Sequence, residues 1–581
     1  MTELDRAGVS RRAFLKTAAA GGLAVGAAAA LPKWALPTAH AANGETGQAG
    51  LNILFIMVDQ LRAPYVYMPR ALQKFVCPTL TSLGDEGVRF NHYYTVSNDC
   101  TPARAAQVSG LYTHQIGIFG TTGDATLNPG FPTFGTALRE HGYDTYWFGK
   151  WHVTPSDVTG DGTINGCMAN PYEAYGFTVP DPTTGTCPSP DGGAGQGQFM
   201  DPVTRQQFRD WLGGRAVGGK PWFATVSLIN PHDIQFYPYY TRRIQGEQFP
   251  RHLYKDMAAN FETNAQRDAH RKPEIQYSSV LAHNDTFGDL PMKARVVEPW
   301  RKMLDTYADM TFDVDLQIYS VLKALGNSPF ADTTVVVFTS DHGEYAGAHG
   351  MRGKGFSFYE EGSRVPLIVK DPTGTWTADT KTDRNQLFSS VDLAGLFLTI
   401  ASGSNAWRKD SRYQQWARRA DLAGVCKDPK AKGRAYVAHA TDEEATLPPQ
   451  LGGDGSSTVY PGANHITAVR THVAKIARYA YWKEGGYEID ESKGVEWELY
   501  DYRTKGGRME LDNVAYDPAS KDLLVRMKRL LQFAMTHEIQ RPVPSTLKSA
   551  QDAAFVAWFG SDTTSPPTPP ITMDSFRVTV T

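Results

Sequence analysis

The chain has 581 residues, 41% of them hydrophobic and 20% charged, a length that suits one large core plus a smaller domain. Its 58 basic and 61 acidic residues give a formal net charge of −3, which argues against a nucleic-acid-binding surface.

The N-terminus has the pattern of an export signal. Segment 10–16, SRRAFLK, contains two adjacent arginines and precedes an Ala/Gly-rich apolar run over 17–31. The run is too short and too rich in glycine for a membrane anchor. With a small-x-small cleavage site at 39–41, the pattern predicts a twin-arginine signal peptide over 1–41 and a periplasmic or extracellular protein. No other stretch is long and apolar enough to span a membrane.

The first predicted strand covers 51–58, LNILFIMV, and is followed by Asp59 and Gln60. A continuous apolar run of this length is typical of a strand buried on both faces of a parallel sheet. Acids at the carboxyl end of such a strand lie where open α/β sheets bind ligands. A helix-capping role for Asp59 is the alternative.

Segment 98–104, NDCTPAR, is interpreted as a helix start that carries a thiol. Proline is favoured at the first helical position, so Pro102 would place Thr101 at the N-cap and Cys100 just before it. Unpaired N–H groups and the helix dipole would lower the pKa of that thiol, and Arg104 adds a cation in the first turn. A buried structural cysteine is the alternative.

Helices and strands then alternate as in an α/β protein. Helices are predicted over 78–87, 133–141, 303–325 and 390–401, and strands over 143–149, 221–228 and 334–340. Lys150 and His152, then His232, then Asp341 and His342 follow these three strand ends in turn. Segment 154–219 is expected to be a long loop or insertion. Segment 236–300 has no clear hydrophobic periodicity and is interpreted as a substrate-specific wall of the site.

After about residue 430 the pattern changes to short alternating strands over 466–469, 474–481 and 496–502, then a helix over 520–537. These predict a small antiparallel sheet with one helix. The Pro-rich segment 563–570 is either an ordered strap or a loose tail. Besides Cys100, the chain has Cys77, Cys167, Cys187 and Cys426. Cys167 and Cys187 flank a Gly/Pro-rich loop and can pair after export, but the connectivity stays open.

The spacing Cys-x-Pro-x-Arg at 100–104 resembles the signature of sulfatases, in which the cysteine is oxidised to formylglycine (3-oxoalanine). Further matching blocks follow in the family's order: GKWH at 149–152, PH at 231–232, DHGE at 341–344, GKG at 353–355 and YEEGSRVPL at 359–367. Segments 498–501 and 507–513 resemble the family's C-terminal subdomain. The resemblance implies an alkaline phosphatase-like α/β fold, with a large, mixed, mostly parallel sheet between helices and a smaller C-terminal antiparallel sheet plus helix. The implied domain bounds are linker 42–50, catalytic domain 51–430, C-terminal subdomain 431–545 and tail 546–581.

The resemblance also implies a site and an activity, the hydrolysis of sulfate monoesters by an exported, arylsulfatase-like enzyme. The hydrated aldehyde is the nucleophile, His232 protonates the leaving alcohol, and His152 takes the proton that expels sulfate. Lys150, Lys354 and Arg104 neutralise the developing charge. A divalent metal is held by Asp59, Gln60, the modified Cys100, Asp341 and His342. The implied partners are a sulfate ester, a formylglycine-generating enzyme and the twin-arginine translocase.

Three positions depart from the usual sulfatase pattern. Ala103 replaces a serine, but Cys, Pro and Arg are the residues read by the modifying enzyme. Gln60 and His342 stand where many sulfatases have Asp and Asn, a pairing that resembles the phosphonate monoester hydrolase and choline-sulfatase branch. A phosphonate monoester hydrolase or phosphodiesterase is therefore the alternative function, and an inactive binding protein is a third.

The metal is expected to be Ca²⁺, because Asp and Gln supply hard oxygen ligands. The imidazole of His342 favours Mn²⁺ instead, and Mg²⁺ is a further alternative.

Overall fold

The structure is a computed structural model that describes residues 50–121, 125–154, 172–179, 196–238, 252–293, 296–447, 458–483 and 486–559. The predicted signal peptide, Cys167, Cys187 and segment 563–570 lie outside these ranges. Among the described residues, no helix combines the length and apolarity needed to cross a membrane.

A seven-stranded sheet forms the centre of the large domain, in the order β3-β4-β1-β5-β6-β2-β7. Strand β1 pairs in parallel with β4 and β5, and β3 pairs in parallel with β4, whereas β6 runs antiparallel to both β5 and β2. The predicted mixed, mostly parallel sheet is therefore confirmed. Its strands are β1 (Asn52–Asp59), β2 (Val88–Tyr94), β3 (Asp144–Gly149), β4 (Trp222–Pro231), β5 (Thr334–Ser340), β6 (Leu367–Lys370) and β7 (Arg384–Ser389).

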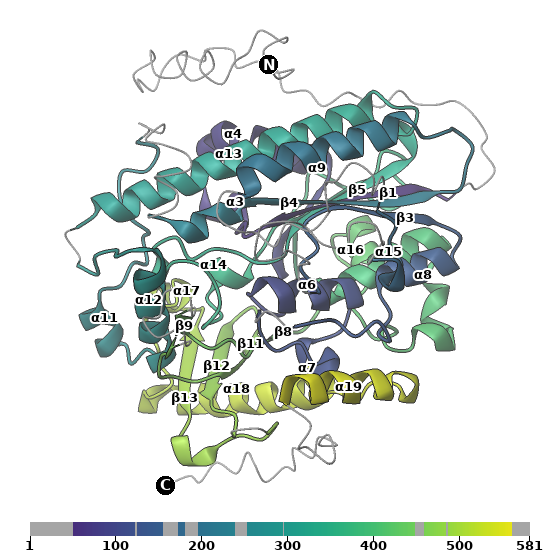
Figure 1. The fold of residues 1–581 in the computed structure, drawn as a ribbon. Coiled ribbons are helices and arrows are strands. Elements are labelled where there is room, and N and C mark those ends of the chain that lie inside the picture. The colour runs from purple at the N-terminus through teal and green to yellow at the C-terminus, as the bar shows by residue number, and fades with distance from the viewer. Residues whose placement is uncertain are drawn as a thin grey trace. The chain divides into compact units, whose positions relative to one another are not determined.

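Helices cover both faces of this sheet, as Figure 1 shows. Alternate residues of β1 belong to two separate apolar clusters: Phe55 lies in one and Ile56 in the other. The Phe55 face is covered by α6 (Cys100–Ser109), α8 (Phe134–Glu140) and α15 (Leu393–Ser402), and the Ile56 face by α5 (Pro78–Glu86), α9 (Gln196–Gly213) and α13 (Glu298–Gly326). Each buried side chain of this kind stabilises the fold by about 1.5–3 kcal/mol, so both faces fix the strand in place.

Part of the expected loop over 154–219 is helical, because α9 occupies Gln196–Gly213. Two contacts hold it. Phe208 packs edge-on against Phe148 of β3, with ring centroids 5.6 Å apart. The carboxylate of Asp201 accepts hydrogen bonds from the backbone N–H groups of Ile229 (2.6 Å) and Asn230 (2.9 Å). Both contacts are long-range, which is why local sequence did not reveal this helix.

The predicted substrate wall over 236–300 also contains regular structure. The 3₁₀ helix η3 (His232–Phe236) ends at its first residue, and the segment contains α11 (Asn264–Ala269) and α12 (Glu274–Phe287). Helix α13 starts within the same segment, at Glu298.

The second, smaller sheet is antiparallel throughout, in the order β13-β12-β11-β8, which confirms the predicted C-terminal architecture. Helix α18 packs on one face, and residues of α12 contribute to the cluster on the other. Its elements are β8 (Val437–Thr441), β11 (His465–Arg470), β12 (Ala474–Ala480), β13 (Glu496–Asp501) and α18 (Lys521–Ala534). Within the predicted tail 546–581, Lys548–Phe559 forms helix α19, which lies beside α7 (Thr113–Ile116).

Candidate active site

Adjacent strands of the large sheet bring the predicted site residues to one edge. Asp59 is the last residue of β1, and Asp341 directly follows β5, where Val58 is paired with Ser340. Lys150 follows β3, and its backbone N–H donates to the Ser227 carbonyl of β4 at 3.0 Å. His232 begins η3 immediately after β4. The carboxyl ends of these strands therefore gather two acids, a lysine and a histidine in one place.

Cys100 is the first residue of α6, and Asp99 is its N-cap. The helix therefore starts two residues earlier than the proline predicted, and Pro102 is its third residue. The reason is that the first four N–H groups of a helix have no partner within it, so proline is tolerated in the first turn. The Cys100 Sγ atom lies 2.6 Å from Lys354 Nζ, 3.2 Å from His342 Nε2 and 3.9 Å from Lys150 Nζ.

Arg104, one turn further along α6, joins both aspartates. Its Nη2 donates to Asp59 Oδ2 at 2.9 Å and its Nε to Asp341 Oδ2 at 2.7 Å. Its Nη1 donates to the Lys150 carbonyl and to Ser227 Oγ, both at 3.0 Å. The guanidinium is fully buried, so these four contacts fix the first turn of α6, and Cys100 with it, against the strand ends.

The charges around Cys100 favour its thiolate. Burial and the carboxylate of Asp59 raise the pKa of the Cys100 thiol, but Lys150, Lys354 and His342 outweigh them and hold that pKa well below the usual value. Burial also raises the pKa of Asp59, whose neighbours Lys150 and Arg104 more than compensate and keep it ionised. Lys150 Nζ lies 2.7 Å from Asp59 Oδ2. The site is a buried set of paired charges built around one sulfur.

Two imidazoles complete this set. His152 and His232 both lie near Cys100, whose thiolate favours the protonated form of each ring. Burial, reinforced by Lys150, lowers the pKa of His152, and burial with the charges of Lys150 and Lys354 lowers the pKa of His232 to about 3. Both rings are therefore neutral near pH 7. A neutral imidazole beside a nucleophile can accept a proton, and one that has gained a proton can pass it to a leaving group.

The donor atoms at the strand ends fit a divalent cation. Ligand atoms of Asp59, Cys100, Asp341 and His342 all lie within 4.8 Å of one another and are buried. His342 Nδ1 donates to the Gly343 carbonyl at 3.0 Å, which leaves Nε2 facing the carboxylates, as in a metal-ligating histidine. Burial lowers the pKa of His342, but the neighbouring Asp341 carboxylate outweighs it and raises that pKa to about 9.

Gln60 connects this donor set to Lys354. Its backbone has φ 68°, in the left-handed region that a non-glycine residue adopts only under local constraint. Its N–H donates to Asp341 Oδ1 at 3.1 Å. In the side chain, Nε2 donates to Glu344 Oε2 at 2.5 Å, and Oε1 accepts from Lys354 Nζ at 3.0 Å. The amide oxygen is thereby presented on the side of the site where Lys354 meets Cys100.

The structure brings together all ten residues selected from the sequence, and it adds three others. Ser227 is buried inside β4, and nothing in its apolar surroundings distinguishes it. Asp99 precedes Cys100 and accepts from Thr441 Oγ1 at 2.8 Å; burial raises its pKa to about 6. Glu344 lies three residues after Asp341. Its position just after a predicted strand is the sequence feature that could have identified it as a site residue. Neither Asp99 nor Glu344 belongs to the sequence-based set.

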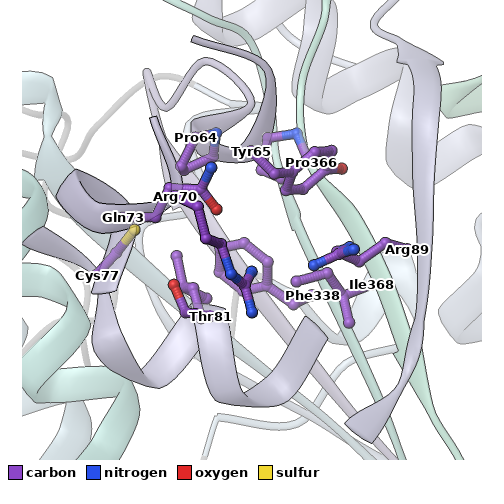
Figure 2. Close-up of a pocket in the computed structure, with 11 residues that line it drawn as sticks. Pro64, Tyr65, Arg70, Gln73, Cys77, Thr81, Arg89, Phe338, Pro366 and Ile368 are labelled. Atoms are coloured by element: carbon purple, nitrogen blue, oxygen red, sulfur yellow. The ribbon is translucent and has the colours of Figure 1, made fainter. Parts of the chain in front are cut away.

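A small separate cavity lies between α4 (Arg70–Val76), α5 and the strands β5 and β6, and Figure 2 shows its lining. It measures about 10 Å³, the space of about one water molecule, and none of the ten site residues lines it. Cys77 lies at this cavity, where burial raises its thiol pKa well above the usual value. Burial likewise raises the thiol pKa of Cys426 to about 12, so both of these free cysteines are protonated structural residues, unlike Cys100.

Comparison with known proteins gives one family. The sulfatase family model matches residues 51–404, more than half of the chain. The uncharacterized sulfatase YidJ of Escherichia coli K12 is 29% identical over 387 residues, 60% of this chain and 67% of the relative. An N-acetylglucosamine-6-O-sulfatase of Bacteroides thetaiotaomicron is 25% identical over 417 residues, 64% of this chain and 71% of the relative.

A solved structure agrees on the fold. The phosphonate monoester hydrolase of Silicibacter pomeroyi superposes with a TM-score of 0.60 at 22% identity, covering 86% of this chain and 96% of that one. The strand-end acids, the Cys-x-Pro-x-Arg helix start and the extent of the family match lead to one conclusion: this chain belongs to the sulfatase family, hydrolases of the alkaline phosphatase superfamily.

Proposed function

We propose that the protein hydrolyses sulfate monoesters to an alcohol and sulfate, at the site around Cys100. The observation that carries this proposal is the set of three buried cations, Lys150, Lys354 and Arg104, that surrounds one cysteine and two strand-end aspartates. Buried cations of this kind stabilise the negative charge that develops on the transferred group. The N-acetylglucosamine-6-O-sulfatase among the relatives supports the same reaction class.

Two groups that the structure does not contain belong to this proposal. Formylglycine formed from Cys100 would supply the nucleophilic hydroxyl, and a divalent ion held by Asp59, Gln60, Asp341 and His342 would polarise it. We propose Ca²⁺ because three of these four side chains offer oxygen, with Mn²⁺ or Mg²⁺ as alternatives.

We assign the remaining roles to the protein's own side chains. The neutral ring of His232 would first take up the proton that the attacking hydroxyl loses and then pass it to the departing alcohol oxygen, and His152 would accept the proton whose removal releases sulfate. Lys150 and Lys354 bind the oxygens of the transferred group. Arg104 orients the two aspartates and fixes the helix start.

We further propose that the protein is exported by the twin-arginine route, which carries folded proteins. A formylglycine-generating enzyme would then act on Cys100 before export. The support for this part is the sequence pattern over 10–41.

A phosphonate monoester hydrolase or phosphodiesterase is the second candidate, favoured by one observation: a neutral amide and an imidazole, Gln60 and His342, stand beside the two aspartates. Sulfate monoesters, phosphodiesters and phosphonate monoesters are all monoanions, whereas a phosphate monoester, with a second pKa of about 6, carries nearly two charges. Charge therefore separates only the phosphate monoester from the other three.

The test is kcat/KM for matched aryl esters of sulfate, phosphate, phosphodiester and phosphonate, assayed on enzyme made with a formylglycine-generating enzyme. We expect the sulfate ester to be the best substrate. If the phosphodiester or the phosphonate exceeds it by more than about tenfold, about 1.4 kcal/mol in transition-state binding, the second candidate replaces the first.

A further inference from the structure

A row of aromatic rings extends from His232 along the wall of the site. Phe236 of η3 lies with its ring centroid 5.8 Å from that of His232, and Phe287 of α12 lies 5.5 Å from Phe236 at 87°. His283, one turn before Phe287 on α12, follows at 6.0 Å. Phe236, His283 and Phe287 are all partly exposed. Because His232 is the proposed proton donor to the leaving alcohol, this row lies on the leaving-group side of the site.

The end of the row returns to the nucleophile. His283 Nε2 lies 2.5 Å from the position that a Cβ atom would take on Gly353, whose φ is +73°. Gly353 precedes Lys354, whose Nζ lies 2.6 Å from Cys100 Sγ. A side chain at position 353 would collide with the imidazole, so glycine lets the ring approach the loop that carries Lys354. His232 and Lys354 thus mark the two ends of one wall.

Arg352 holds this wall in place. Its guanidinium donates to the carbonyl of Tyr237 at 2.7 Å, to that of His283 at 2.6 Å and to that of Gly288 at 2.7 Å. These bonds tie the end of η3 and the C-terminal turn of α12 to the loop containing Gly353 and Lys354. The wall is therefore preorganised rather than assembled from independent surface residues.

The hydrogen-bonding state of His283 is fixed. Its Nδ1 lies 2.7 Å from the Ser279 carbonyl oxygen, which can only accept, so Nδ1 carries the proton. Burial, together with the charge of Arg352, lowers the pKa of His283 to about 4, so the ring is neutral near pH 7. Nε2 is then a hydrogen-bond acceptor, and it has no hydrogen-bond partner among the described residues. A partly exposed, oriented acceptor next to Lys354 is suited to a ligand hydroxyl.

We infer that His283 is a specificity-determining residue, which accepts a hydrogen bond through Nε2 from a hydroxyl next to the sulfated position, and that the leaving group is a saturated polyhydroxylated ring packed against Phe236 and Phe287. The inference rests on the proposed function and names its substrate class as cyclic polyol, or carbohydrate, sulfates. The apolar C–H faces of such a ring suit the aromatic row, and its neighbouring hydroxyl suits the single acceptor.

The test uses two substrates that differ by one hydroxyl, 2-hydroxycyclohexyl sulfate (cis and trans isomers) and cyclohexyl sulfate. For the unmodified sequence, the better hydroxylated isomer should exceed cyclohexyl sulfate in kcat/KM by about five- to tenfold or more, the range for one hydrogen bond in a preformed site. In His283→Phe, which keeps a ring but loses the acceptor, this ratio should fall to about one. In His283→Gln, whose amide oxygen can still accept, part of the ratio should remain.

Leu281→Ala, at an exposed position of the same helix, is the control and should keep the full ratio. Thermal unfolding of each variant separates a folding defect from a lost contact. The inference is overturned if the unmodified protein shows no preference, or if His283→Phe keeps it.

If the proposed function is wrong, the protein will cleave no sulfate ester at all, which differs from cleavage without a preference for the hydroxylated substrate. The same matched pair, made as methylphosphonate monoesters, would then decide the role of His283.

Discussion

The side-chain amide of Gln60 donates to the carboxylate of Glu344 at 2.5 Å, and this single bond determines which way the amide faces. The other carboxylate oxygen, Glu344 Oε1, accepts from the backbone N–H groups of Ala346 (2.9 Å) and Gly353 (2.7 Å). With its NH₂ group on Glu344, Gln60 must point its oxygen toward Lys354 and the proposed metal ligands. Glu344 thus positions both a proposed metal ligand and the loop that carries Lys354.

Glu344→Gln should therefore weaken metal binding. The new NH₂ group would face that of Gln60, and the simplest relief is a flip of Gln60 that turns its NH₂ toward the metal. Loss of such an outer partner lowers metal affinity by about 10- to 100-fold. Competition with a chelator measures this directly. The double variant Glu344→Gln/Gln60→Glu reverses the polarity of the bond and should recover most of the affinity.

Glu538→Gln is a control for this experiment, because Glu538 is a partly buried carboxylate that is bonded to Arg434 and Tyr112 and not to any site residue. It should leave metal affinity unchanged. Equal metal affinity in Glu344→Gln and the unmodified protein would remove Glu344 from its positioning role.

Cys100 is expected to be formylglycine when the protein is made together with a formylglycine-generating enzyme. Mass spectrometry of the peptide that contains residues 100–104 measures the conversion. Cys100→Ala should abolish turnover and change the thermal midpoint little, since the side chain is small and the first turn is anchored by Arg104. Full activity with an unmodified thiol would contradict the mechanism, and a large loss of stability in the variant would favour a structural cysteine.

Asp341→Asn keeps the shape of the side chain but removes one negative charge from the donor set. Metal affinity should fall by at least about tenfold together with activity, because hard cations select anionic oxygen ligands. Elemental analysis that finds full occupancy in the variant would exclude Asp341 from the ligands.

Glu262 gives a pH-dependent prediction outside the site. Its carboxylate pairs with His270 Nδ1 at 2.6 Å and with His349 Nδ1 at 2.8 Å. Burial alone raises the pKa of Glu262, but the His349 hydrogen bond and the charge of Lys272 outweigh it and set that pKa at about 2. A depressed carboxyl pKa stabilises the fold above the unfolded-state value of about 4.3, and this contribution is lost as pH falls toward 2.

Glu262→Gln should accordingly be less stable than the parent at pH 7, by about 3 kcal/mol at most. The difference should shrink progressively between pH 5 and pH 3, because the parent carboxylate approaches protonation while the amide does not titrate. Urea unfolding of both proteins at pH 7, 5, 4 and 3 provides the measurement. A difference that stays constant over this range would show that the ion pairs of Glu262 contribute nothing to stability.

The sequence by itself determined the parts of this protein that depend on local patterns. The apolar run before Asp59 lacks the alternation of polar and apolar residues that marks a half-exposed strand, because it is buried on both faces of the sheet. It ends in an acid, which indicates the edge of the sheet where ligands bind. The same reasoning located Lys150, His232 and Asp341, because each follows a strand whose direction the α/β alternation already fixes. The motif at 100–104 indicated the proposed nucleophile.

Tertiary structure alone decided the rest. Helix α9 is held by bonds from Asp201 to β4 and by Phe208 against β3, contacts that no local period records. The orientation of the Gln60 amide depends on Glu344, 284 residues away in the chain. The meeting of His283 with Gly353 likewise joins α12 to a distant loop. In each case the deciding free energy comes from burying a polar group or ring against a partner remote in sequence, so only the folded chain specifies it.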